Sequence, residues 1–100
     1  MQMLTIVCRE KFDVNVVVLF KKLGIKGYTV MSGAGGSGQR GEAGKHGWAD
    51  HNTLFLVALD DAQMATLVTA AKELHVRLVA ENGGMEVALK AFLHPCEVIL

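Results

Sequence analysis

Apolar residues occur in two patterns along the chain: short continuous runs, and longer stretches in which they recur with helical spacing. The short runs are rich in β-branched and aromatic residues, which is typical of strands, and they cover residues 3–8, 28–31, 52–59 and 86–94. The run NTLFLVAL at 52–59 is apolar at consecutive positions, so we expect it to be covered on both faces, in the middle of a sheet. The last run alternates and stops at Pro95, as a strand should.

The two longer stretches predict helices, over 12–23 and from Asp60 or Asp61 to the Gly83-Gly84 pair. Several valines in the first stretch also suit a strand, but its apolar residues form one helical stripe: Phe12, Val16, Leu19, Phe20 and Leu23. Asp13 is expected to cap this helix, and Gly24 to end it. In the second stretch a break near His75, followed by a short strand at 77–81, is the alternative to one long helix.

The order βαββαβ predicts an α+β, ferredoxin-like domain spanning residues 1–100. Its four-stranded antiparallel sheet carries both helices on one face. The strands are apolar on both sides, so other subunits are expected to cover the open face, and we expect a homotrimer. In this topology Cys8 and Cys96 lie a strand length apart, which predicts no disulfide between them.

Composition and charge exclude several classes of protein. Apolar residues make up 51% of the chain and charged residues 20%. The formal net charge is zero, so binding to nucleic acid through a broad positively charged surface is not expected. No apolar run approaches the ~20 residues that span a membrane, so no membrane insertion is expected. The first residues lack the features of a signal peptide, and the expected location is cytoplasmic, with reduced thiols.

A long glycine-rich loop, at about residues 33–51, separates the second and third predicted strands. Its seven glycines are Gly33, Gly35, Gly36, Gly38, Gly41, Gly44 and Gly47. So much glycine is expected to prevent regular structure and to leave the segment flexible, while backbone N–H groups approach an anion closely. The loop lacks the Gly-Lys-Ser/Thr ending of a Walker A motif.

Three groups of residues around this loop form a recognisable series: Gly24, Gly27, Thr29 and Val30, then Gly35, Gln39, Arg40 and Gly41, and then the aliphatic strand 55–61 with its acidic end. This series resembles the PII signal-transduction family. The segment KAFLHPCE at 90–97 resembles the strand that follows the family's second nucleotide loop. The resemblance covers nearly the whole chain and is specific from Gly24 to Glu42.

This resemblance implies a trimer that binds an adenine nucleotide (ADP, AMP or ATP) in clefts between subunits, does no chemistry on a substrate, and contacts a partner protein through its flexible loop. It places the base near Thr29, counts Val57 among the nucleotide-binding residues, and places the phosphates near the loop base and a neighbouring lysine. The positions carried over for the phosphates are Gly35, Gly36, Ser37, Gly38, Gln39, Arg40 and Lys90. From the residues alone, Arg40 could equally be a solvated loop residue, and Lys90 a charge at a strand edge.

Two departures from the family pattern indicate a divergent, PII-like protein. The segment 33–50 contains no tyrosine, so regulation by tyrosine uridylylation is not expected. The family's terminal pair of arginines, which clamps phosphates, has no counterpart here, so a diphosphate or monophosphate should bind at least as well as a triphosphate. Such divergent relatives resemble regulators of transport or of carbon and metal handling.

Other residues of the loop allow two further interpretations. Trp48 suits an anchor for a partner, such as a membrane transporter, or a hydrophobic lid folded back on the body. His46, Asp50 and His51 have ligand types that bind transition metals, so a metal-responsive trimer of the CutA or efflux-associated kind is the alternative function. The main hypothesis expects no metal. A nucleophilic pair of Cys8 and His94 would lack a third group to orient the histidine.

Overall fold

A computed structural model describes residues 1–38, 41–43 and 51–100 of the chain. The elements are β1 (Gln2–Arg9), the one-turn helix η1 (Glu10–Phe12), α1 (Asp13–Lys22), β2 (Thr29–Ala34), β3 (Gly36–Gly38), β4 (Gly41–Ala43), β5 (Asn52–Leu59), α2 (Asp61–Glu81) and β6 (Leu89–Pro95). β5 has the bounds that the apolar run predicts.

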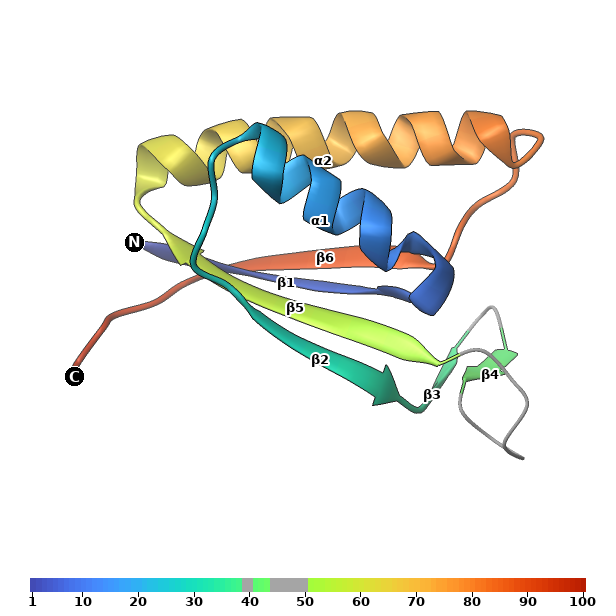
Figure 1. Cartoon of the computed structure of the whole chain (residues 1–100), viewed down its shortest axis with the longest axis horizontal. Coiled ribbons are helices and arrows are strands. Elements are labelled where there is room, and N and C mark those ends of the chain that lie inside the picture. Colours follow the sequence, from blue (N-terminus) through green and yellow to red (C-terminus); the bar gives the residue numbers. More distant parts are fainter. Residues whose placement is uncertain (39–40, 44–50) are drawn as a thin grey trace.

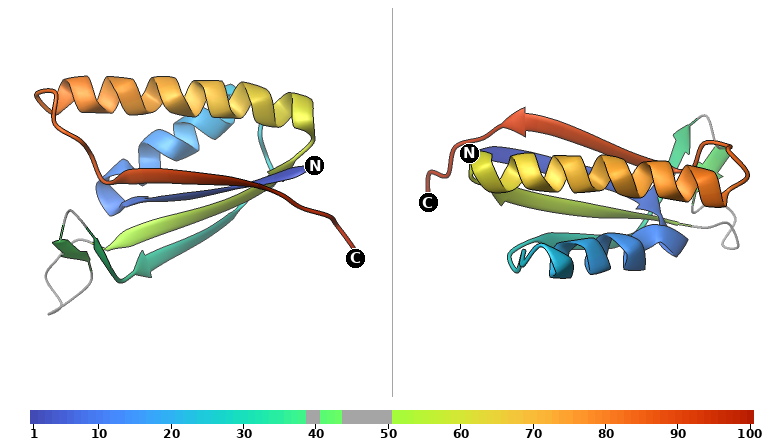
Figure 2. Two further views of the ribbon diagram at one scale, coloured as in Figure 1. Left: turned by 180° about the vertical axis from the view of Figure 1, so that it is seen from behind. Right: turned by 90° about the horizontal axis from the view of Figure 1, so that it is seen from above.

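Four antiparallel strands form one sheet in the order β2-β5-β1-β6, and both helices lie on the same side of it (Figure 1, Figure 2). This arrangement confirms the predicted ferredoxin-like α+β fold, with β1 and β5 in the middle. β1 and β5 pair over their whole length, from Gln2 opposite Leu59 to Arg9 opposite Asn52.

Alternate residues of the central strands fill the core beneath the helices. The buried side chains of this core include Leu4, Ile6, Cys8, Phe55, Val57 and Leu59 from the strands, and Val16, Phe20, Met64 and Leu67 from the helices. Phe20 packs edge-on against Phe55, with 5.7 Å between ring centroids, and Tyr28 lies 4.8 Å from Phe20. These aromatic contacts join α1 to the sheet and to the segment that leads into β2.

The end of α1 follows the prediction, and its beginning does not. Gly24 adopts φ of +70°, a conformation that favours glycine, and donates to the Lys21 carbonyl. Ile25 donates to the Phe20 carbonyl, which completes a Schellman motif. The expectation that Asp13 caps the helix is wrong. The one-turn helix η1 comes directly before α1, Phe12 occupies the N-cap position, and Asp13 is the first residue of α1. Its carboxylate instead accepts a long hydrogen bond of 3.5 Å from Thr53.

α2 is one continuous helix, so the alternative of a break near His75 is wrong. Its apolar stripe stays on one face through four buried residues, Met64, Leu67, Leu74 and Leu78. Asp60 precedes the first turn, and its carboxylate accepts a hydrogen bond of 2.8 Å from the Gln63 backbone N–H. This is the N-cap that the sequence predicts.

The glycine-rich segment contains more regular structure than its composition predicts. β2 continues to Ala34, with a register shift between Met31 and Ala34 where Gly33 has φ of +74°. β3 and β4 then pair as a short antiparallel ribbon. Ladder hydrogen bonds join only backbone groups, so strands of glycine can form them without side-chain support. The expectation of no regular structure is therefore wrong for residues 36–38 and 41–43.

The last strand begins later than predicted, at Leu89 rather than Glu86. Val87 is buried against Leu74 and Leu78 near the end of α2, so its alternation with polar neighbours reflects packing of the connecting segment. The Ala88 carbonyl accepts from the Arg9 N–H at 2.9 Å, and pairing with β1 starts at Leu89.

Replacing Asp60 by Ala should lower the free energy of unfolding by about 0.5–2 kcal/mol, because one backbone N–H of the first turn loses its acceptor. Urea denaturation at a fixed protein concentration measures the change. Gln63→Ala is the matched control, because it keeps the backbone donor and should leave stability nearly unchanged. An equal loss in both variants would contradict the capping role.

Candidate functional site

Several connecting segments meet at one end of the sheet. There the end of β1 leads into η1, β5 begins, and the segment 82–88 joins α2 to β6 (Figure 1). Two backbone hydrogen bonds of 2.9 Å tie them together: Arg9 N–H to the Ala88 carbonyl, and Glu10 N–H to the His51 carbonyl. The β3–β4 ribbon reaches the same end, because a Cβ atom on Gly36 would lie 3.5 Å from Asn52 Nδ2.

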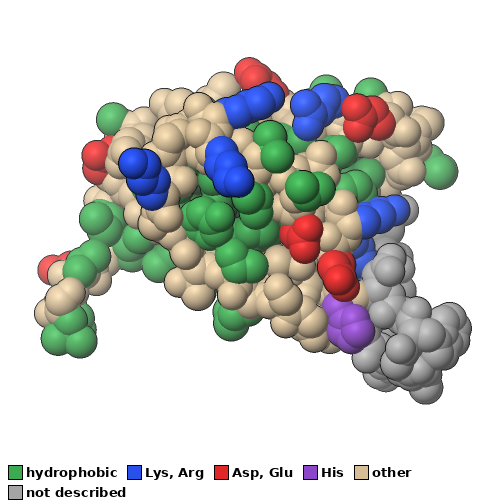
Figure 3. Space-filling view, viewed as in Figure 1, with side chains coloured by type: hydrophobic (Ala, Val, Ile, Leu, Met, Phe, Trp, Pro, Cys, Tyr) green, Lys and Arg blue, Asp and Glu red, His purple; other side chains and the backbone are tan. Residues whose placement is uncertain are grey.

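A polar pocket of about 390 Å³ lies at this end, between the β1–η1 turn and the segment 82–88. Its lining residues are Arg9, Lys11, Phe12, Asn82, Glu86, Val87 and Ala88. Figure 3 shows Lys or Arg, Asp or Glu, and His side chains close together at this end of the molecule. Two cationic side chains, an amide and nearby backbone groups are the chemistry that binds phosphate or carboxylate.

Glu86 forms one wall of this pocket and remains ionised near neutral pH. Its Oε1 lies 2.6 Å from His75 Nε2 and accepts a hydrogen bond of 2.9 Å from the Val87 N–H. The hydrogen bond from His75, and then that from Val87, lower the pKa of the Glu86 carboxyl. These hydrogen bonds hold the carboxylate against α2 and against its own backbone. Its negative charge would repel an anion, so an anion in the pocket would have to bind to other groups.

Thr29, the position carried over for the base, and Val57, carried over as a nucleotide-binding residue, differ in accessibility. Thr29 is exposed at the start of the edge strand β2, where it pairs with Leu56. Val57 is buried beneath the helices, so only its backbone could contact a bound base.

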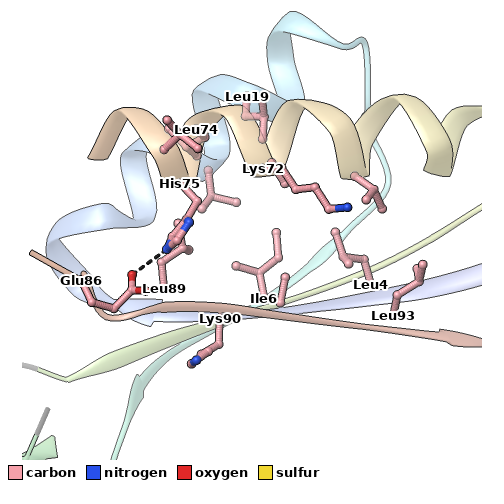
Figure 4. Close-up of a pocket in the computed structure, with 15 residues that line it drawn as sticks. Leu4, Ile6, Leu19, Lys72, Leu74, His75, Glu86, Leu89, Lys90 and Leu93 are labelled. Atoms are coloured by element: carbon pink, nitrogen blue, oxygen red, sulfur yellow. Dashed lines mark hydrogen bonds and ion pairs between the residues drawn. The ribbon is translucent and has the colours of Figure 1, made fainter. Parts of the chain in front are cut away.

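Lys90 lies on the opposite edge strand, β6. Figure 4 shows its side chain pointing away from the helices, toward the open face of the sheet. Two strands, β5 and β1, separate it from Thr29. The two residues therefore lie at opposite edges of the sheet.

Only some of the predicted site residues of the glycine-rich loop lie in the part of the chain that the structure describes. Gly35 lies between β2 and β3, and Gly36, Ser37 and Gly38 form β3. Gln39, Arg40, His46, Trp48 and Asp50 lie outside the described residues. Of the proposed metal ligands only His51 is described, and no cluster of three or more His, Cys, Asp or Glu suited to a metal occurs in the described part of the chain.

The structure separates the cysteines from each other and from His94. Cys8 pairs with Leu89 at one end of the β1–β6 ladder, while His94 pairs with Met3 at the other end. Both thiols are free, and Cys96 lies beyond the end where His94 sits, as the predicted topology requires. Burial, and then the nearby Asp13 carboxylate, raise the pKa of the Cys8 thiol to about 12, so it is a poor nucleophile.

The sequence analysis missed Arg9 and Lys11. They follow a predicted strand in a short polar turn, and their spacing matches no known motif. Only the return of the segment 82–88 to the end of β1 makes them part of a pocket. The alternation of charge at residues 9–11 was the one available signal. Among the described residues, neither helix is long and apolar enough to cross a membrane.

Comparisons with known proteins give one family and a shared fold. The family described as Nitrogen regulatory protein P-II matches residues 1–88. No curated protein sequence matches the chain. Among solved structures, the PII-like protein CPII from Thiomonas intermedia K12, bound to ADP, AMP and bicarbonate, has a TM-score of 0.69 at 19% identity, over 93% of this chain and 82% of that one.

Two further structures have the same fold. CPII bound to ADP and bicarbonate gives a TM-score of 0.67 at 18% identity, with the same coverage of both chains. A PII-like signaling protein from Thermus thermophilus gives 0.57 at 22% identity, over 93% of this chain and 82% of that one.

Alkylation should distinguish the two thiols. At about pH 8.5 iodoacetamide should modify Cys96 in the native protein and leave Cys8 intact, because Cys8 is 1% exposed and its pKa is raised. In guanidinium both should react, which is the control. Since the pKa of Cys8 is higher in the folded state, this group's contribution to stability should be complete below about pH 9 and fall as the pH rises toward 12. Native labelling of Cys8 at the rate of Cys96 would contradict the burial.

Proposed function

The chain belongs to the Nitrogen regulatory protein P-II family, and on that premise we propose that it is a cytoplasmic, trimeric, non-enzymatic regulator that senses an adenine nucleotide between subunits. The observation that carries the proposal is the placement of Thr29 and Lys90 on opposite edges of one sheet. Each edge offers half of a site, and a neighbouring copy would supply the other half. The proposed readout is the segment 33–51, which would engage a partner protein, such as a membrane transporter, with Trp48 as anchor.

The open face of the sheet supports assembly. Across from the helices, β2 and β5 present Met31, Leu54 and Leu56, and β6 presents Phe92, which is 57% exposed. One layer of two helices covers only one face of a sheet, so this second apolar face needs another cover. Three copies that pack these faces together would also bring the edge strands of different subunits close to each other.

The polar pocket supports binding of an anionic effector. CPII binds ADP, AMP and bicarbonate, all of which are anions. In this chain Arg9 and Lys11 line a pocket at the end of the sheet where β2 and the β3–β4 ribbon also lie, and phosphates or a small anion would find charged donors there. We propose that the nucleotide's phosphates lie toward this end, near the backbone of 35–38 and Gln39.

Placing a charge on the open face should abolish assembly. We expect wild-type protein to be a trimer and Phe92→Glu to be a monomer, because three carboxylates would be buried together without partners. Light scattering coupled to size exclusion gives the mass. The matched control is Val14→Glu, which adds the same charge to an exposed position of α1 (59% exposed) and should remain trimeric. A monomeric wild type would refute the assembly.

Calorimetry should detect ADP or AMP binding at least as tight as ATP binding. Gln39→Ala removes about one hydrogen bond to a phosphate, worth ~1.5–3 kcal/mol, so the affinity should fall roughly ten- to hundredfold. Gln63→Ala is the control, because it makes the same change in the first turn of α2. Absence of binding by any adenine nucleotide at millimolar concentration would refute the sensor function. Binding that Gln39→Ala leaves unchanged would refute only the placement of the site.

A further inference from the structure

A second cavity, larger and mostly apolar, lies between α2 and the edge of the sheet formed by β1 and β6. Its volume is about 630 Å³, which is the size of a small-molecule site. Leu4 and Ile6 of β1 form its floor, Leu89 and Leu93 of β6 one side, and residues 68–76 of α2 its roof (Figure 4). Leu93 is 45% exposed, so the groove opens to solvent along β6.

One cationic side chain reaches into this apolar groove. Figure 4 shows Lys72 extending from α2 into the space between the helix and the sheet, above Leu4 and Ile6. No acidic residue lies three or four positions from Lys72 on the helix, and none of the described residues forms an ion pair with it. An ammonium group at the rim of an apolar cavity complements a ligand with an anionic head and an apolar body.

The other polar groups of the groove favour one orientation of such a ligand. His75 Nε2 and Glu86 Oε1 form a hydrogen bond of 2.6 Å nearer the other end of the groove. The Glu86 carboxylate would repel an anionic head there, while Lys72 would attract it. Between Lys72 and the end of β6 the lining is aliphatic, with Leu4 and Leu93 facing the cavity.

We propose that this groove binds a free medium-chain carboxylic acid, with its carboxylate at Lys72 and its alkyl chain over Leu4 and Leu93. The groove adjoins the end of the sheet where the nucleotide's phosphates are proposed, since Glu86 and Lys90 contribute to its lining. It lies on the helix side of the sheet, so assembly through the open face leaves it accessible. The His75–Glu86 pair stands between it and the polar pocket, because Glu86 lines both.

Calorimetry with hexanoate, octanoate and decanoate, each below its micelle concentration, tests the proposal. Affinity should rise with chain length by up to about fourfold for each added methylene. Lys72→Gln should weaken decanoate binding about tenfold, through loss of a charged partner. Arg77→Gln, on the same helix but outside the groove, is the control and should bind as the wild type does. Decanol should bind the wild type more weakly than decanoate.

A second variant tests the cavity itself. Ala91 lies on the edge strand β6, pairs with Ile6 and lines the groove on the helix side of the sheet. Ala91→Phe should fill the space and abolish decanoate binding, while thermal unfolding shows that the fold is retained. Decanoate binding that is equal in wild type, Lys72→Gln and Ala91→Phe would overturn the proposal. Binding to vesicles of anionic lipid without any binding of free decanoate would overturn it too, by assigning the surface to a membrane.

Discussion

The pairing of β1 with β5 is the constraint on which the rest of the structure depends. Eight consecutive residues of each strand face each other, and side chains alternate between the two faces of the sheet. A slip of one residue would place Phe55 and Ile6 on opposite faces of the sheet, so only one of them could remain in the core. The same register places Arg9 beside Asn52, so it determines both what the helices cover and which groups meet at the site end of the sheet.

The fold could be predicted largely because its signals are local. The run 52–59 is bounded by polar residues on both sides, and the stripe of α2 keeps its helical period without interruption. Gly24 ends α1 because only glycine adopts its backbone conformation without strain. Each of these features depends on neighbours within a few residues along the chain, so the sequence alone contains the information.

The features that the sequence analysis predicted wrongly or missed depend on contacts between distant segments or on hydrogen bonds between backbone groups. Val87 alternates like a strand residue, but its packing against Leu74 and Leu78 is a tertiary contact. The β3–β4 ribbon is held by backbone hydrogen bonds that composition does not reveal. The polar pocket arises where β1 and the segment 82–88 converge, so the role of Arg9 and Lys11 was not visible in their short turn. The buried position of Val57 follows only from the strand register.

The separation of Thr29 from Lys90 has a consequence for mixed assemblies. If each cleft is formed by the β2 edge of one copy and the β6 edge of another, a substitution of Thr29 and a substitution of Lys90 inactivate different halves of the site. Two inactive variants combined in one ring would regenerate a cleft with both halves intact. A single altered copy would spoil one cleft and leave the others able to respond. The inheritance of such mutations would thus be graded, with partial dominance and complementation between alleles.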